Sequence, residues 1–345
     1  MSKTETPDDA APHPRRTAVL YGHRDAEAML LDAYRGGAMP HAWLIGGAAG
    51  IGKATLAYRL ARFVLAHGDP AAPTVQAATS LALDREHPVA RQVATGAYGG
   101  LLTLERVMNE RGVMNTVITV DQVRRTTAFF GSTAAAEGWR VCIVDCVEEL
   151  NANAANALLK MLEEPPPRSL FLLVSRAPSR VLPTIQSRCR KLPLRPLDEA
   201  AVAQAAAEAA GLSTDDAALA EAAAASEGSV GRALMLLGGD ALVLRERTMA
   251  LLAALPEIDG NALHALGDAL AVNDRAALAT VMDTLEHWVA MQLRQPDAAR
   301  HLSRLARLGE VWDNISRSAR ETETFNLERK PLVFAAFGLL AEVTR

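Results

Sequence analysis

The sequence predicts an α/β domain with a parallel sheet, followed by two all-helical domains. As far as residue 194, short apolar runs alternate with segments whose apolar residues recur at helical spacing, which is typical of a sheet covered by helices on both faces. After Pro196 only the helical pattern continues, in stretches rich in alanine. A chain of 345 residues also exceeds the size of one average core. We therefore expect four segments: a disordered tail over 1–16, the α/β domain over 17–194, a small helical domain over 195–241 and a larger helical domain over 242–345.

Runs of apolar and β-branched residues predict three buried strands, at 42–45, 140–145 and 169–175. Regular structure also resumes at 115–120, and Asp121 is the expected N-cap of the helix that follows. A further helix is expected over 153–164, because Pro165 stops its pattern. Between residues 68 and 100 the periodicity is lost, and Pro, Gly and Asp gather there. This segment is predicted to be a loop-rich excursion.

The composition is that of an ordinary globular chain without a strong overall charge. The net charge is −4 and the pI is about 6.1, so no overall basic character indicates a nucleic-acid binder. Cys142, Cys146 and Cys189 are too few and too scattered for a disulfide framework and indicate a reducing compartment. No apolar run approaches the roughly 18 residues of a membrane span, and residues 1–16 lack the apolar segment of a signal peptide. We expect a cytoplasmic protein.

Residues 47–55, GAAGIGKAT, have the spacing of a phosphate-binding loop between a strand and a helix. Its candidate phosphate-binding residues are the glycines and the first residues of the helix: Gly47, Gly50, Gly52, Lys53, Ala54 and Thr55. Glycines let the backbone approach a phosphate, and Lys53 supplies positive charge. Ala54 stands where the motif has the Ser or Thr that ligates Mg²⁺. Thr55 comes one residue later, about 100° around the helix, so the loop predicts phosphate binding without that metal ligand.

An acid closes the predicted strand at 140–145. Asp145 occupies the strand end at which a phosphate-binding site places its metal-holding carboxylate. Attack by water also needs a base, and the next residue is Cys146, a thiol with a reference pKa near ~8.5 that is a poor base for water. Glu148 and Glu149 lie nearby, but they would reach a phosphate only from an irregular strand end. The loss of both the metal ligand and the base argues against turnover.

Ser187-Arg188-Cys189 follows the last of the predicted strands. Arg188 is either an ordinary surface charge or an arginine finger, which donates positive charge to phosphoryl transfer in a neighbouring subunit. The residue pattern alone leaves both interpretations open.

Several longer stretches are similar to the clamp-loader branch of AAA+ proteins. They are NALLKMLEEPP at 156–166, SRC at 187–189, ITVDQVR at 118–124, GSVGRAL at 228–234 and YGHRD at 21–25. Within that branch the chain most resembles the delta-prime subunit family of bacterial DNA polymerase III. The resemblance covers roughly residues 20–235, whereas residues 242–345 agree only in being helical.

The resemblance implies a subunit of a ring that uses ATP to open a sliding clamp and set it on primed DNA. Its partners would be gamma/tau and delta subunits, and its two helical domains would be a lid and a collar. Hydrolysing members usually have a glutamate where this chain has Cys146. Delta-prime proteins are usually stators without hydrolysis that supply the Ser-Arg-Cys arginine in trans, a role that falls on Arg188. The alternative is a catalytically active AAA+ ATPase that resembles the gamma/tau subunit.

Three departures from the family pattern affect what is carried over. Many relatives have a four-cysteine zinc module in the segment corresponding to 68–100, where this chain has no cysteine, so we expect no zinc. Many delta-prime proteins lack the loop lysine, whereas Lys53 is present, which keeps binding of ATP or ADP open. In active ATPases a nucleotide-sensing arginine follows the Gly-Ser-x turn. In this chain Gly231 holds that position and Arg232 comes next, so Arg232 is a candidate nucleotide contact.

No histidine of the chain falls in a metal-ligand pattern, and no metal site is predicted. In the C-terminal domain an apolar stripe recurs at helical spacing, formed by Leu278, Met282, Leu285, Val289 and Leu293. Such a stripe is typical of an internal core, and the collar of the family leaves a subunit surface as a second interpretation.

Overall fold

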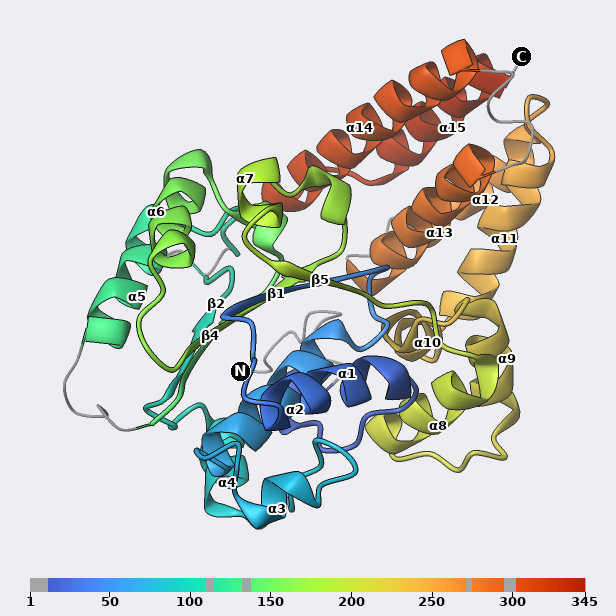
Figure 1. The fold of residues 1–345 in the computed structure, drawn as a ribbon. Coiled ribbons are helices and arrows are strands. Elements are labelled where there is room, and N and C mark those ends of the chain that lie inside the picture. The colour runs from blue at the N-terminus through green and yellow to red at the C-terminus, as the bar shows by residue number, and fades with distance from the viewer. Residues whose placement is uncertain (1–11, 109–113, 132–137, 271–274, 295–301, 345) are drawn as a thin grey trace, which may run out of the picture. The chain divides into compact units, whose positions relative to one another are not determined.

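The structure is a computed structural model that describes residues 12–108, 114–131, 138–270, 275–294 and 302–344. The chain divides into two compact units that meet between Ala233 and Leu234. Each unit is described by itself. Figure 1 gives the course of the chain and the labels of its elements.

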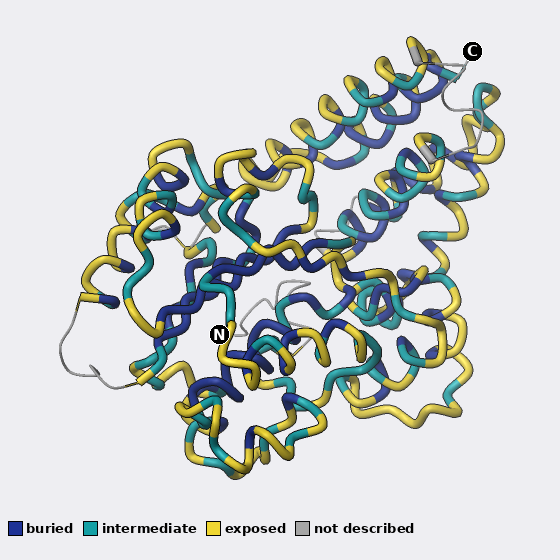
Figure 2. Tube along the Cα trace, in the orientation of Figure 1, coloured by how far each residue is buried: buried dark blue, intermediate teal, exposed yellow. Residues whose placement is uncertain are grey.

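A parallel sheet of five strands forms the centre of the first unit. In spatial order the strands are β2 (Leu101–Leu104), β3 (Arg140–Val144), β4 (Ser169–Ser175), β1 (Ala42–Gly46) and β5 (Arg190–Pro193). Every residue of β1, β3 and β4 is buried, and these strands appear as dark blue segments in Figure 2. The three strands expected from the sequence are therefore confirmed. The two strands at the edges of the sheet, β2 and β5, were missed because each has only four residues, of which half or fewer are buried.

Alternate residues of the central strands pack on opposite faces of the sheet, as the two-residue period of a strand requires. Trp43 and Leu172 belong to one hydrophobic core, together with residues of α1 (Arg24–Arg35) and α2 (Lys53–Ala66). The neighbouring positions on these strands belong to a second core, which contains residues of α5 (Val120–Gly131) and α6 (Ala152–Glu163). The prediction of a parallel sheet covered on both faces is thus confirmed.

The helix expected to follow Asp121 begins before it, at Val120, so Asp121 is not its N-cap. The residue before α5 is Thr119, and Gln122 Oε1 accepts a hydrogen bond from the Thr119 amide at 2.9 Å. A glutamine three residues after a threonine is the reciprocal pattern of a capping box. Asp121 lies in the first turn instead, where its negative charge is favoured by the helix dipole. Residues 115–118 form no named strand, although Ile118 makes an isolated parallel bridge with Leu150.

The segment over 68–100 contains two short helices, α3 (Pro73–Gln76) and α4 (Pro88–Thr95), as well as loops. Each begins with a proline at its first position, where the missing N–H has no cost. Val75, Leu81 and Val93 of this segment are fully buried in the core beside α2. Among the described residues no group of three or more His, Cys, Asp or Glu side chains could hold a metal ion.

The tail expected over 1–16 lies outside the described residues as far as Ala11, and from Pro12 onward it differs from the prediction. Pro14–Arg16 form a 3₁₀ helix, η2. The buried Arg62 donates hydrogen bonds to the carbonyl oxygens of Arg15 (3.2 Å) and Thr17 (2.8 Å). The guanidinium donors of α2 thereby fix a backbone segment that carries no hydrophobic signal of its own.

Three helices follow the sheet within the segment expected to be a lid: α8 (Glu199–Ala210), α9 (Ala217–Ala225) and α10 (Val230–Leu236). Glu208 of α8 joins this segment to the sheet domain. Its two carboxylate oxygens accept hydrogen bonds from Tyr21 Oη (2.8 Å) and Arg85 Nη2 (2.5 Å).

The second unit contains five helices within its described residues: α11 (Ala241–Ala253), α12 (Gly260–Leu270), α13 (Arg275–Arg294), α14 (Leu302–Thr324) and α15 (Lys330–Thr344). The expected apolar stripe lies on α13. Leu278, Leu285 and Val289 are buried in the core of this unit, whereas Leu293 is exposed. No helix in the described part of the chain is long and apolar enough to cross a membrane.

Candidate functional site

The predicted phosphate-binding loop connects β1 to α2, as its sequence context requires. Gly47, Gly50 and Gly52 all have positive φ angles, and Gly52 is the N-cap of α2. Gly50 is also required by space, because a Cβ atom there would collide with Ser229 Oγ and would lie 3.0 Å from the Gly231 Cα. The loop therefore packs directly on the Gly228–Arg232 turn, a neighbour that the sequence did not reveal.

Four consecutive carbonyl groups of the loop, from Ala48 to Ile51, each make a hydrogen bond with another part of the chain. Their partners, in order, are Lys53 Nζ, Ser229 Oγ (2.9 Å), the Gly231 amide (3.1 Å) and His23 Nε2 (2.7 Å). Since a carbonyl only accepts, His23 carries its proton on Nε2. Burial lowers the pKa of His23, and the backbone contact partly opposes this change. The loop is thus held on its carbonyl side by side-chain and backbone donors from three segments of the chain.

Lys53 is the first residue of α2, and only 5% of its surface is exposed. Its Nζ donates to the Ala48 carbonyl. Burial, followed by the positive charge of Arg176, lowers the pKa of Lys53 from 10.5 to about 8, although Cys146, Asp145 and Glu148 act in the opposite direction. The ammonium group therefore lies where an anion would relieve its desolvation.

The two residues after Lys53 give no replacement for the missing metal ligand. Ala54 has no oxygen in its side chain, and Thr55 is the third residue of α2. The first N–H groups of an α-helix have no partner within the helix, so the start of α2 still offers donors to an anion. The start of α2 therefore has donors for an anion, whereas Ala54 offers no side-chain oxygen to a metal ion.

Asp145 directly follows β3, and its amide donates to the Leu104 carbonyl at 2.9 Å. Burial raises the pKa of Asp145, and the nearby Arg176 partly opposes this effect. Cys146 comes next with a positive φ of 60° and is 3% exposed. Burial raises the pKa of the Cys146 thiol to about 12, so it is neutral at pH 7 and cannot accept a proton from water.

Each of the two glutamates beyond Cys146 has a partner on one carboxylate oxygen. They lie in the 3₁₀ helix η4 (Val147–Glu149). Glu148 Oε1 accepts hydrogen bonds from the amides of Arg176 (2.7 Å) and Ala177 (3.2 Å), and Glu149 Oε2 pairs with Arg106 Nε at 2.9 Å. Glu149 could act as a base only by leaving Arg106, whereas Glu148 holds both amides through Oε1 and keeps Oε2 buried without a hydrogen-bond partner.

Arg232 lies in α10, next to the loop through its backbone. Its amide donates to Ser229 Oγ at 3.1 Å, and its guanidinium pairs with Glu227 Oε2 at 3.9 Å. The backbone of this turn thus contacts the loop through Ser229 and Gly231, while the Arg232 side chain is directed to Glu227.

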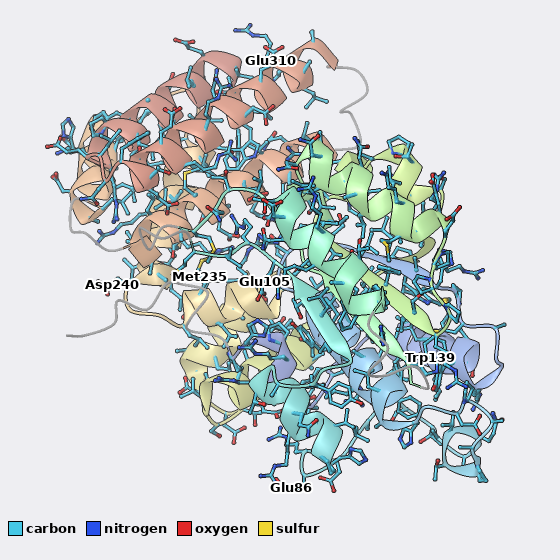
Figure 3. The ribbon with its side chains drawn as sticks, turned by 90° about the vertical axis from the view of Figure 1, so that its left-hand side faces the viewer. Glu86, Glu105, Trp139, Met235, Asp240 and Glu310 are labelled. Carbon is cyan, nitrogen blue, oxygen red and sulfur yellow. The ribbon has the colours of Figure 1, made fainter. Side chains whose placement is uncertain are left out.

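Arg188 lies apart from the phosphate-binding loop. It follows α7 (Pro183–Gln186) and precedes β5, whereas the loop follows β1, and the two strands are parallel. In a parallel pair, a group that precedes one strand and a group that follows the other lie at opposite ends of the strands. Figure 3 labels one residue at each of these two ends: Glu105 just after β2, and Trp139 just before β3.

The Arg188 side chain is 34% exposed, and its guanidinium makes three contacts. It donates to Glu163 Oε1 (2.6 Å), the Thr184 carbonyl (2.8 Å) and Ser187 Oγ (3.4 Å). Sequence reasoning did not identify Glu163, although it belongs to the NALLKMLEEPP stretch. It also missed His23, Ser229 and Gly231 as partners of the loop, since only the fold brings them to it.

The buried charge of Lys53 yields a prediction about stability. The unfolded lysine binds its proton more tightly than the folded one, so between about pH 8 and 10.5 the unfolded state holds more protons and stability rises with pH. Lys53→Met should therefore raise the free energy of unfolding at neutral pH by on the order of 1–3 kcal/mol. The gain should vanish as the pH rises toward about 10.5, because the wild-type lysine is then neutral. Ala48 is exposed, so water can satisfy its carbonyl in the variant.

Urea unfolding of both proteins across this pH range tests the prediction. Lys160→Met is the matched control, because Lys160 is exposed and its replacement should give no pH-dependent gain. A Lys53→Met variant that is less stable than the wild type at every pH would show that desolvation of the Lys53 ammonium does not destabilise the fold.

Comparison with known proteins identifies the family. The family described as "DNA polymerase III, delta subunit" matches residues 22–198. The DNA polymerase III subunit delta' of Pseudomonas aeruginosa is 40% identical over 149 residues, which are 43% of this chain and 41% of that protein. The subunit delta' of Escherichia coli is 32% identical over 265 residues, covering 76% of this chain and 72% of that protein.

The gamma/tau subunit of Mycobacterium bovis is 31% identical over 277 residues, which are 77% of this chain and 44% of that protein. The chain thus spans less than half the length of two of these three relatives, and the delta' protein of E. coli is matched over most of its length. The match to the family description covers about half of the chain and includes the loop, Asp145 and Arg188. The chain belongs to the delta' family of DNA polymerase III subunits, and it is a clamp-loader protein related to gamma/tau.

Proposed function

We propose that this delta' subunit is a stator of the clamp loader, which does not hydrolyse ATP and supplies Arg188 to the ATP site of an adjacent gamma/tau subunit. It would act in the cytoplasm with gamma/tau and delta subunits to place the sliding clamp on primed DNA. The single observation that supports the absence of hydrolysis best is Cys146: a buried, neutral thiol occupies the position that follows the strand-end aspartate.

Hydrolysis of ATP needs a metal ion to neutralise phosphate charge and a group that orients or deprotonates the attacking water. Ala54 removes the hydroxyl that would ligate the metal. Cys146 removes the base, and the nearby Glu148 is bound to two backbone amides. These losses affect two separate steps, so restoring one of them would not restore turnover.

The competing function is an active ATPase of the gamma/tau kind, and the 31% identity to a gamma/tau subunit is the observation that favours it. Lys53 and Asp145 are both present, as an active site would require. However, burial shifts the pKa of each toward its neutral form. The thiol of Cys146 is neutral, and Glu148 and Glu149 each bind partners through one carboxylate oxygen. Relatedness within one family does not separate the two functions, and a turnover assay does.

The purified chain should hydrolyse no ATP above background. A rate of about 1 per second lies at the low end of ordinary enzymes and is readily measured by release of phosphate. Lys53→Ala, purified in parallel, is the control for contaminating ATPases. Turnover of about 1 per second or more that Lys53→Ala abolishes would make the chain an active ATPase.

We also propose that the loop can bind ATP or ADP, with an affinity that does not depend on magnesium. Lys53 Nζ would exchange the Ala48 carbonyl for a phosphate oxygen, and the first N–H groups of α2 would complete the cradle. Since Ala54 cannot ligate a metal, a magnesium ion would add little to binding.

Equilibrium titration of the isolated chain with fluorescently labelled ATP, in magnesium and in excess chelator, tests this proposal. The two dissociation constants should agree within about threefold, because a metal held by two good ligands would change the affinity by much more. Lys53→Ala should weaken both equally. Binding that requires magnesium would contradict the proposal, and so would a signal that Lys53→Ala leaves unchanged.

The role of Arg188 in trans is supported by its place in the fold. Arg188 lies at the opposite end of the strands from the loop, so its guanidinium has no access to a phosphate held by its own chain. Its side chain is partly exposed. A finger of this kind is worth about 10³–10⁵ in rate at the site that it completes.

Arg188→Ala should leave assembly of the reconstituted clamp loader intact and lower its ATPase, stimulated by DNA and clamp, severalfold or more. The fall is limited by the other ATP sites of the ring, which keep their own fingers. Arg91→Ala is the matched control, since Arg91 is an exposed arginine on α4 of the same domain. An unchanged rate in a fully assembled Arg188→Ala complex would remove this role, while the fold and the family would stand.

A further inference from the structure

Arg188 is held by a residue from a different element. Glu163, the last residue of α6, accepts a hydrogen bond from Arg188 Nη2 at 2.6 Å, across 25 positions of sequence. Both side chains are partly exposed, at 48% for Glu163 and 34% for Arg188. The contact joins the end of one helix to the segment that precedes β5.

The position of Glu163 is fixed by the helix that carries it. Asn151 caps the start of α6 by accepting from the Ala154 amide at 2.8 Å, and the buried face of the helix includes Leu158 and Leu162. Pro165 restricts the residue before it and prevents the helix from continuing. Glu163 therefore follows a buried leucine at the last position of the helix, and its carboxylate contacts Arg188.

A carboxylate is disfavoured at this place. The C-terminus of a helix carries partial negative charge, which opposes an anion. Water screens the attraction within an exposed ion pair, so the Glu163–Arg188 pair adds little to stability. The main effect of the Glu163–Arg188 pair is therefore on geometry. It restricts the long Arg188 side chain, which would otherwise adopt many rotamers.

The three contacts of Arg188 leave part of its guanidinium available. Nη1 donates to the Thr184 carbonyl and to Ser187 Oγ, and Nη2 donates one hydrogen to Glu163. Nε takes part in none of these three contacts, and Nη2 has a second hydrogen. A phosphate oxygen could thus approach the guanidinium without displacing Glu163.

We propose that Glu163 is a positioning residue for the arginine finger, which orients the Arg188 guanidinium before a neighbouring subunit presents its phosphate. This inference rests on the role in trans proposed above for Arg188. Preorganisation of a long, charged side chain lowers the entropy that is lost when the finger engages the phosphate. Glu163 should then affect the rate of ATP hydrolysis by the complex only through Arg188.

The test is the ATPase of the reconstituted clamp loader, stimulated by DNA and clamp, with four variants of this chain. Glu163→Ala should lower kcat by at least about threefold with little change in KM for ATP, since the finger acts on the transition state. Glu163→Gln, which keeps an oxygen acceptor, should retain an intermediate rate. Arg188→Ala should lose more, and the double variant Glu163→Ala/Arg188→Ala should match Arg188→Ala alone.

Glu164→Ala is the matched control, because Glu164 is an exposed carboxylate at the same helix end. It should leave the rate unchanged. Size-exclusion chromatography of each complex checks assembly, and Glu163→Gln keeps the test decisive if Glu163→Ala assembles poorly. An intact Glu163→Ala complex with the wild-type rate, beside a slowed Arg188→Ala complex, would overturn this inference and leave the finger in place.

Two other results would also overturn it. A faster Glu163→Ala complex would mean that Glu163 competes with phosphate for the finger. Additive losses in the double variant would mean that Glu163 acts independently of Arg188. If Arg188→Ala itself has no effect, the proposed role in trans fails, and the positioning role fails with it.

Discussion

All five strands of the sheet run in the same direction, and this constraint decides where each functional group of the domain lies. The segments that leave the strands lie at the carboxyl ends of the strands: the predicted phosphate-binding loop after β1, Asp145 after β3 and Arg176 after β4. Arg188 precedes β5 and so lies at the amino ends of the strands. The four residues of β5 alone span about 13 Å. Strand direction therefore places the loop and Asp145 at one end of the strands and Arg188 at the other.

Burial governs the chemistry at the edge that carries the loop. Desolvation is the largest cause of each pKa change there: the pKa of Lys53 falls, while the pKa values of Asp145 and Cys146 rise. Every one of these changes favours the neutral form of the group. In an active ATPase the charges of metal, lysine and aspartate compensate one another. In this chain Ala54 provides no ligand for the metal, and the positive charge that acts on all three groups is that of Arg176.

The sheet and the phosphate-binding loop could be predicted from the sequence because their signals are local. β1, β3 and β4 are continuous apolar runs, and the glycines of the loop stand at fixed spacing. The short strand β5 has only Leu192 buried, so it shows no such run. The backbone of residues 15–18 is held by hydrogen bonds from Arg59 and Arg62 of α2, which are more than 40 positions away in the sequence.

The partners of the site residues were harder to predict, since they come from distant segments. Nothing local in the sequence pairs Ser229 with Ala49, 180 positions away, or Glu163 with Arg188. The start of α5 did have a local signal, because Thr119 and Gln122 have the spacing of a capping box. The acid at Asp121 was a competing signal for the same helix start. Local patterns could therefore single out candidate residues, but they could not give the contacts that these residues make with distant segments.

The contact between the loop and the Gly228–Arg232 turn bears on the proposal of a stator. Ser229 Oγ and the Gly231 amide bind loop carbonyls directly, and a Cβ atom at Gly50 or Gly231 would come within 3.1 Å of the other glycine. Glu208 adds a second connection through Tyr21 and Arg85. None of these bonds uses a phosphate. The helical segment that follows the sheet is thus tied to it by groups of the chain itself, which suits a subunit whose shape does not have to change with the nucleotide.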